Sequence, residues 1–360
     1  MHPLVGKRIS MLRIILILSV VFLHLGAPLV QELDRADVLQ LLQFFFQDQL
    51  GRIAMPTLSM ISGYLLFAAS LDRTPLTLYR KKARTLLVPF LVFNVAYFAL
   101  QYAIEYATGW APLYSITNKT APQLLNLAFG YADNPLNFAL HFLRDLFVLI
   151  LLAPLFGILI RRLPTIGLML VFTVFMSDLD GHLVNRNTMA VLFYVGGMAA
   201  VWRWDLLKFD RFAPYCLAGL VAVCAAMIHS HTESYVYVYL VSPFLVWPAA
   251  ALLAGTRIGD WALRHSKYSF FLFLAHVPLI RVAQLLHGKM AWLPQWAYLA
   301  LGLVLIPLFL FRIYDAANHL MPGTFAFLTG GRNKKDGASA APQRLPVADP
   351  LSDDEPTLAA

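Results

Sequence analysis

Two residues that could do chemistry lie inside one apolar segment near the start of the chain. The segment KRISMLRIILILSVVFLHLGAPLV, residues 7–30, carries Arg13 and His24 eleven positions apart. At about 100° per residue in a helix, this spacing puts both side chains on one face. They lie about 16 Å apart along the axis. A charged side chain and an imidazole in an apolar span are costly, so each needs a partner or a function. We expect both to face one cavity.

His24 suits the role of a general base. An imidazole can take a proton from a hydroxyl near neutral pH while that hydroxyl attacks a carbonyl carbon. The alternative for His24 is helix packing, with the ring bonded to a neighbouring carbonyl or Ser. Arg13 also has two interpretations. Its side chain either extends to the lipid headgroups or faces inward and holds an anion such as a phosphate.

A basic stretch and a small-residue motif follow the first segment. The stretch YRKKARTLLVPF contains Arg80, Lys82 and Arg84. These residues either anchor a membrane span or clamp the phosphates of a nucleotide-like cofactor, because Arg80 and Arg84 are one helical turn apart. Gly63 permits close helix packing, and the neighbouring Ser62 can bond across an interface or contact a substrate.

The fourth apolar segment begins HFLRDLF, with three titratable residues in its first turns. Adjacent residues on a helix point in different directions, so we expect Arg144 and Asp145 to have different partners. His141 and Asp145 are four residues apart and can pair. A structural ion pair is the alternative to a functional role for this group.

Later histidines fall into two groups. His276 lies as deep in its apolar segment as His24 does in the first, and Pro278 loosens the helix ladder beside it. The two histidines could therefore line one cavity. We assign no chemistry to four histidines expected in outer loops: His182, His229, His231 and His287.

The composition indicates an integral membrane protein. Hydrophobic residues make up 59% of the chain and charged residues only 13%, about half the charged share of soluble domains. The net charge of +8 is distributed at the ends of apolar spans, as in membrane proteins, so we expect no nucleic-acid partner. There is no CxxC or HExxH motif, and we predict no metal site.

We expect an all-α membrane protein, a polytopic bundle of about ten transmembrane helices. Apolar runs of about 17–25 residues can cross a bilayer. The expected spans are residues 12–30, 50–71, 86–107, 139–160, 166–179, 189–202, 212–228, 236–254, 268–286 and 292–313.

Charge places both chain ends in the cytoplasm. With the N-terminus inside, 20 of the 28 Lys and Arg residues fall in cytoplasmic segments and five on the opposite face, which favours an even number of spans. We predict a membrane domain over residues 1–329 and a disordered cytoplasmic tail over residues 330–360. The outer loop at residues 108–138, which contains Trp110, is long enough to cap a cavity.

Taken in order, these motifs resemble the acyltransferase-3 family of membrane O-acyltransferases. The likeness covers residues 8–315. Arg13 and His24 match the family's Arg-x10-His motif on a first helix, although the Asp-Gly or Asp-x-Leu that usually precedes the Arg is missing. Phe142 stands where Trp is commoner. The other similar stretches are ISGYLLF, RKKARTLLVPF, FLRDLFVLILLAPL, FYVGGMAA and YSFFLFLAHVPL.

The resemblance implies an acyl-CoA donor, acetyl-CoA foremost, that enters from the cytoplasm and an acyl group that goes to a sugar hydroxyl. The acceptor is often a lipid-linked or exported glycan. The resemblance gives His24 the catalytic role and Arg13 a role in positioning the donor. The 11-residue spacing would match the reach of a pantetheine-like arm from an anchored phosphate to the thioester.

We therefore predict a bacterial inner-membrane acyltransferase, transferring groups other than aminoacyl groups, that modifies surface polysaccharide such as exopolysaccharide or lipopolysaccharide units. Polysaccharide biosynthesis machinery is an expected partner. The CoA phosphates would meet Arg80, Lys82 and Arg84. The residues predicted to meet the acceptor are His276, Arg144, His141, Ser62 and Trp110.

Two other classes of protein remain open. A proton-coupled transporter would suit ten helices with buried Arg and His. Such carriers usually need a buried carboxylate, and we expect carboxylates in the spans only near span ends, at Asp145 and Asp178. A non-catalytic subunit of a polysaccharide machine is the third class.

Overall fold

The structure is a computed structural model that describes residues 2–26, 38–109, 115–230, 236–290 and 292–331. The predicted tail from residue 332 onward and Trp110 lie outside the described residues. Within them the regular structure is helical and contains no β-strand. The all-α prediction is confirmed.

The first half of the chain contains α1 (Pro3–Leu25), α2 (Val38–Gln43), the π-helical segment η1 (Phe44–Gln49), α3 (Leu50–Arg52), α4 (Ala54–Ala68), η2 (Leu71–Arg73), α5 (Pro75–Lys82), the π-helical segment η3 (Ala83–Leu87), α6 (Val88–Thr108), α7 (Ala121–Phe129), η4 (Phe138–Leu140) and α8 (His141–Arg162). The second half contains α9 (Pro164–Met176), α10 (Asn187–Val201), η5 (Asp210–Phe212), α11 (Ala213–Ser230), α12 (Val236–Ala249), η6 (Ala250–Leu253), α13 (Arg257–His265), η7 (Ser266–Tyr268), α14 (Ser269–Gly288), α15 (Gln295–Leu320) and α16 (Pro322–Leu328).

Each of the ten expected spans coincides with an apolar helix. Among the described residues, eight helical segments are long and apolar enough to cross a membrane, and α9 and α10 are shorter, with 13 and 15 residues. Several boundaries differ from the prediction. Four spans begin earlier than expected, at Pro3, Val38, Pro75 and Arg257, and the last span ends later, at Leu320, because the helix continues through polar residues that hydropathy assigns to loops.

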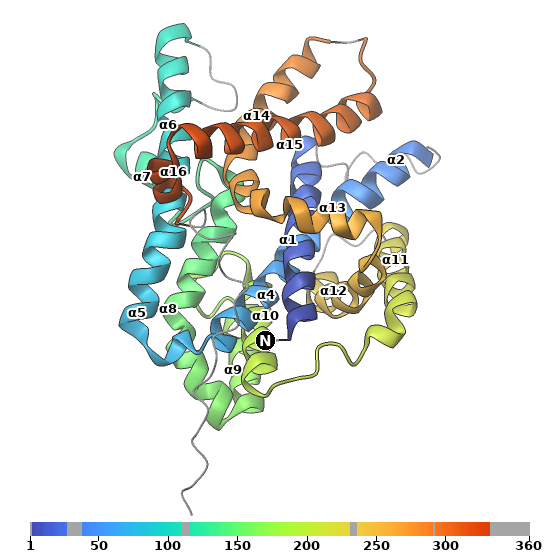
Figure 1. Ribbon diagram of the computed structural model, residues 1–360. Helices are drawn as coiled ribbons and strands as arrows, with labels where there is room; N and C mark the ends of the chain where they lie inside the picture. The colour runs from blue at the N-terminus through green and yellow to red at the C-terminus, as the bar shows by residue number, and fades with distance from the viewer. Residues whose placement is uncertain (1, 27–37, 110–114, 231–235, 291, 332–360) are drawn as a thin grey trace, which may run out of the picture.

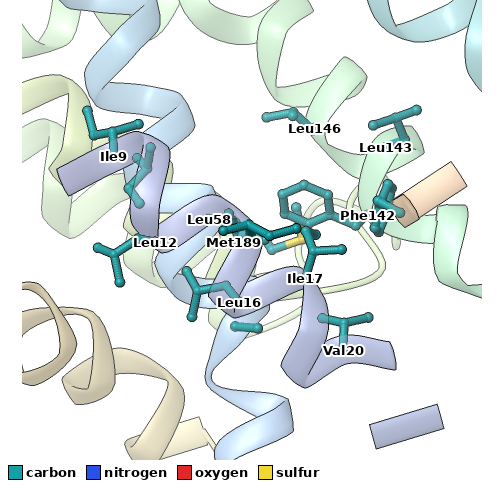
Figure 2. Close-up of a cluster of buried hydrophobic side chains, with 14 of the residues drawn as sticks. Ile9, Leu12, Leu16, Ile17, Val20, Leu58, Phe142, Leu143, Leu146 and Met189 are labelled. Carbon is teal, nitrogen blue, oxygen red and sulfur yellow. The ribbon is translucent and has the colours of Figure 1, made fainter. Parts of the chain in front are cut away.

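Helix α1 lies in the middle of the bundle (Figure 1) and contacts α4, α13, α14 and α15. Its buried residues include Met11, Leu12, Ile17 and Val20, which point in different directions around the axis. A helix that is apolar on every side belongs in a core. Figure 2 shows how residues of α1 meet residues of neighbouring elements such as Phe142. The arrangement places the first helix, with Arg13 and His24, in the interior of the bundle.

Glycines let α4 and α10 touch along their backbones. A Cβ added at Gly63 would collide with the backbone oxygen of Phe193, and one at Gly196 with that of Met60. The predicted close approach at Gly63 is confirmed. It brings α10 against α4, which contributes residues to the cavity described below.

The expectation about carboxylates is wrong at two positions. Glu105 lies inside the third span, and Asp48 lies inside the second because that span begins at Val38. Both are buried and hydrogen-bonded by local partners. Asp48 accepts hydrogen bonds from Arg52, and Glu105 accepts from Ser115, Ile116 and Thr117. Neither carboxylate is left as an unpaired proton carrier.

Candidate functional site

Two polar cavities adjoin α1 at successive levels, and they have no lining residue in common. The His24 cavity, of about 610 Å³, is lined by Leu23, His24, Leu25, Gly26, Gln47, Asp48, Arg52, Phe138, Arg281, Gln284, His287, Gln295 and Tyr298. The Arg13 cavity, of about 480 Å³, is lined by Ser10, Arg13, Ile17, Leu58, Ser62, Leu86, Phe142, Leu143, Leu146, Ser266, Lys267, Ser269, Phe270, Phe273 and Tyr314.

The end of α1 that carries His24 is fixed by side chains from three other elements. The last carbonyls of a helix have no partner within the helix. Here Gln47 donates to the carbonyl of Leu23 (3.2 Å), Gln284 to that of His24 (3.1 Å) and Tyr298 to that of Leu25 (2.9 Å). The three bonds hold the backbone of His24 in one position at the cavity wall.

Two rings hold the imidazole of His24. Phe138 meets it edge to face, with ring centroids 4.7 Å apart. His276 stacks against it, with centroids 5.7 Å apart and an angle of 15° between the planes. His24 is half-buried and lines the cavity. A ring packed in this way has few orientations available, which is what a general base needs.

His276 lies behind His24 rather than in the cavity lining. It is fully buried, and its Nδ1 lies 3.0 Å from the carbonyl oxygen of Leu272 and 2.9 Å from that of Phe273. Carbonyl oxygens only accept, so Nδ1 carries the proton. The buried Nε2 has no partner among the described residues. The two histidines are adjacent, as predicted, but only His24 lines the cavity.

Arg13 faces the other cavity together with Ser62 and Lys267. Its side chain is accessible from that cavity, and it makes no hydrogen bond or ion pair with the rest of the described residues. Ser62 donates to the carbonyl of Leu58 (2.7 Å) and keeps lone pairs that can accept. The Arg13 cavity therefore offers two cations and several hydroxyl groups to a ligand.

The prediction that Arg13 and His24 face one common cavity is wrong. Phe142 and Phe273, which both line the Arg13 cavity, pack edge to face at 6.0 Å, and Phe273 lies 6.2 Å from His276. We call Phe142, Phe273 and His276 the partition. Helical spacing does place both residues toward the interior, but side chains from α8 and α14 fill the space between them.

Each cavity adjoins a π-helical segment, a feature frequent at functional sites. In η1, Gln47 and Asp48 line the His24 cavity. In η3, Leu86 lines the Arg13 cavity.

The basic stretch predicted to bind CoA phosphates surrounds η3. Arg80 at the end of α5 and Arg84 in η3 are exposed, and Lys82 is half-buried. None of the three is part of the lining of the Arg13 cavity, although Leu86 two residues later is. The stretch is therefore close in sequence to a residue that lines the Arg13 cavity, and its two arginines are exposed to solvent.

The expectation that Arg144 and Asp145 have different partners is wrong. Arg144 donates to Asp145 (2.8 Å) and also to the carbonyls of Leu183 and Tyr131. A flexible arginine side chain reaches back to its neighbour where two helical residues alone would diverge. His141 does not pair with Asp145, because its Nδ1 bonds the carbonyl of Phe138 (2.6 Å) instead. Arg144 and His141 therefore organise the segment around Phe138.

Several residues of the His24 cavity were not singled out from the sequence. His287 was assigned to a solvated loop, but it lies on α14, stacks on Tyr298 with centroids 4.3 Å apart and lines the cavity. Arg281, Gln284 and His287 are spaced by three residues. Residues at this spacing share one helix face, so this pattern was the available signal.

The described residues contain no group of three His, Cys, Asp or Glu side chains that could hold a metal ion. The side chains available for chemistry in the His24 cavity are two imidazoles, two guanidinium groups, one carboxylate, three amides and a phenol. This set can move a proton and stabilise negative charge on oxygen.

Comparison with known proteins identifies the family. The family model described as an acyltransferase domain matches residues 7–328. The chain belongs to the acyltransferase-3 family. It is 31% identical, over 367 residues, to the succinoglycan biosynthesis protein ExoH of Rhizobium meliloti (strain 1021), an alignment that covers 94% of this chain and 96% of that protein. No solved structure matches the chain.

Membership of this family confirms three predictions. The protein is an acyltransferase that transfers groups other than aminoacyl groups. It is a multi-pass membrane protein, consistent with its eight long apolar helical segments in the described part of the chain. The family resemblance drawn from Arg13, His24 and the later motifs is correct.

Proposed function

We propose that this protein transfers an acyl group, acetyl foremost, from acyl-CoA to a sugar hydroxyl of a polysaccharide unit, with His24 as general base. The observation that carries the proposal is the position of His24. In a chain of an acyltransferase family, it is an imidazole held between Phe138 and His276 at the wall of a polar cavity.

In the proposed step, one nitrogen of His24 takes the proton of the acceptor hydroxyl. The hydroxyl oxygen forms a bond to the thioester carbon, and the carbonyl electron pair moves onto the carbonyl oxygen. When the carbonyl re-forms, the carbon–sulfur bond breaks. The proton on His24 then goes to the leaving CoA thiolate. His24 ends the cycle neutral, ready for the next acceptor.

The His24 cavity suits a sugar acceptor. Gln47, Gln284 and Gln295 supply amide groups, and Asp48 and Tyr298 supply a carboxylate and a phenol. Sugars are recognised by such hydrogen-bonding groups placed in a cavity of this size. The relative named for succinoglycan biosynthesis supports a polysaccharide unit as the acceptor and the polysaccharide machinery as a partner.

A lipid-linked acceptor is supported by an apolar groove beside the cavity. The groove, of about 960 Å³, runs between α1, α2 and α15 and includes Phe22, Phe46 and Trp296. Gln295 lines both the groove and the His24 cavity. A hydrocarbon chain in the groove would present its sugar to His24.

The donor would occupy the Arg13 cavity. Arg13 and Lys267 can hold anionic phosphates, and the exposed Arg80 and Arg84, with Lys82, can attract CoA electrostatically. Because Lys and Arg are concentrated on one face of the membrane, we place this cavity on the cytoplasmic side of a bacterial inner membrane. The acyl group must then pass the partition to reach His24.

Residue assignments within this scheme follow the geometry. Ser62 lines the Arg13 cavity, so we assign it to the donor rather than to the acceptor. His276 supports the ring of His24, while Arg144 and His141 order the segment around Phe138. We propose that residues 1–329 are the catalytic unit and that both chain ends are cytoplasmic.

The transporter and assembly-subunit alternatives predict no acyl transfer. Purified protein in lipid nanodiscs should move label from acetyl-CoA or succinyl-CoA to succinoglycan oligosaccharides. His24→Ala should lower kcat by about 10²–10⁴-fold, the usual contribution of a general base. His182→Ala, at an exposed histidine, is the matched control and should keep full activity.

Thermal melting of each variant separates loss of catalysis from loss of folding. Full activity in a folded His24→Ala protein would disprove the general-base role. Absence of transfer with every donor, together with uptake of a solute into vesicles, would favour the transporter.

A further inference from the structure

Arg281 is a cation in the His24 cavity that forms no ion pair with a carboxylate of the described residues. It lies on α14, five residues after His276, and lines the cavity. Its Nη1 donates to the neutral Gln284 (2.8 Å). Its buried Nε has no hydrogen-bond partner, and no carboxylate pairs with it, among the residues that the structure describes. An uncompensated guanidinium within a membrane span is costly and indicates a functional role.

The other arginine of the cavity makes the contrast clear. Arg52 donates to Asp48 through Nε (2.9 Å) and Nη2 (2.8 Å). Its charge is therefore balanced by a buried carboxylate on the same helical segment. Arg281 keeps its charge available for a ligand.

The position of Arg281 is tied to that of His24. Gln284 accepts from Arg281 and donates to the carbonyl of His24 (3.1 Å) and, more weakly, to that of Leu25 (3.4 Å). The guanidinium carbon lies 5.1 Å from the centre of the Phe138 ring, whose other neighbour is the His24 ring at 4.7 Å. One amide and one phenyl ring therefore set the distance between the cation and the base.

We propose that Arg281 stabilises the oxyanion formed during acyl transfer at His24, an inference that rests on the proposed function. When the acceptor oxygen bonds the thioester carbon, the carbonyl oxygen gains a full negative charge. The guanidinium donates a hydrogen bond to that oxygen, and the bond weakens again when the carbonyl re-forms and the carbon–sulfur bond breaks. No proton leaves Arg281 at any stage.

This role fits the geometry better than recognition of an anion on the acceptor. An anion carried by the acceptor could be bound anywhere in the cavity, with no fixed relation to the base. The negative charge that develops on the thioester carbonyl oxygen lies beside the attacking oxygen. It is stabilised best by hydrogen-bond donors whose position relative to the base is already fixed before the reaction. The Gln284 bridge supplies that fixed relation, since it bonds both Arg281 and the backbone of His24.

The test is the division of the effect between kcat and KM. Arg281→Met and Arg281→Ala should lower kcat by about 10²–10³-fold, the usual loss when one oxyanion donor is removed. The acceptor KM should change by less than about threefold, because the bond is made only in the transition state. Added guanidinium ion should raise kcat of Arg281→Ala and leave Arg281→Met unchanged.

The matched control is Arg312→Met, at an exposed arginine outside both cavities. It should keep the wild-type constants. A raised acceptor KM with an unchanged kcat in Arg281→Met would overturn the proposal and assign Arg281 to binding an anion of the acceptor. Failure of guanidinium to raise kcat of a folded Arg281→Ala would also count against it.

The two proposals fail in different ways. Activity in His24→Ala disproves the base, whatever Arg281 does. An inactive His24→Ala combined with a fully active Arg281→Met leaves the base in place and removes only the oxyanion role.

Discussion

The two cavities beside α1 differ in how their charged groups are held. In the His24 cavity, Arg52 pairs with Asp48, Arg281 is bridged by Gln284, and the carbonyl of His24 is bonded. In the Arg13 cavity, Arg13 has no partner among the described residues, and Lys267 makes a longer contact with Asp315 (3.5 Å). The first cavity is preorganised, whereas the cations of the second are held by fewer contacts.

This difference matches two tasks. Acyl transfer needs donors and a base at fixed positions, because reorganisation during the reaction raises the barrier. Capture of a long flexible anion needs cations that can follow it, and lysine and arginine side chains do this well. In the proposed scheme, the partition of Phe142, Phe273 and His276 separates the donor cavity from the His24 cavity.

The largest expected effect that separates the cavities is at Arg13. Arg13→Gln should raise the donor KM by about 10–100-fold, because a charge-assisted bond contributes about 1.5–3 kcal/mol. The acceptor KM should not change, since Arg13 lies outside the His24 cavity. Steady-state kinetics with each substrate varied in turn measures both. Arg312→Gln is the control. An equal rise in the donor KM and the acceptor KM would contradict the assignment of Arg13 to the donor alone.

We expect changes in the partition to affect substrate binding little. Their main effect should be on whether the thioester is cleaved only when an acceptor is present. Phe273→Ala should increase CoA release without acceptor by severalfold, because an open partition admits water to the thioester. Phe270→Ala is the matched control, on the same helix and in the same cavity but outside the partition. The rate of thioester hydrolysis is measured by detecting the released CoA with a thiol reagent. Equal rates for both variants would mean that the partition does not exclude water.

The smallest effect is expected at the basic stretch. Arg80 and Arg84 are exposed, and exposed charges usually contribute at most about 1 kcal/mol. A double Arg80→Gln, Arg84→Gln variant should raise the donor KM by about two- to fivefold at low salt and by less at high salt, where charges are screened. A KM that does not respond to salt would indicate direct contact with the donor.

Much of the candidate site could be anticipated from residue type and spacing. Arg13 and His24 stood out because ionisable groups in apolar spans are costly, and both do face cavities. The ten apolar helices followed from hydropathy. Arg281, Gln284 and His287 have the spacing of one helix face, but three-residue spacing is common and only their shared cavity gives it meaning.

Other features depend on contacts between segments far apart in the chain. The π-helical segments that carry Asp48 and Leu86 have no sequence signature, since a π turn forms where packing on both sides favours an extra residue. The reach of Arg144 back to Asp145 depends on where the carbonyls of Leu183 and Tyr131 lie.

The sequence by itself determined the membrane class and the family, and it singled out Arg13 and His24 of α1 as candidates for catalysis, because these depend on composition, local spacing and motif. Only the tertiary structure decided that Arg13 and His24 line separate cavities, and that Arg52 pairs with Asp48 whereas Arg281 has no carboxylate partner among the described residues. The physical reason is that a cavity is bounded by side chains from several helices. Which of them fill the gap between two residues depends on packing across the whole bundle.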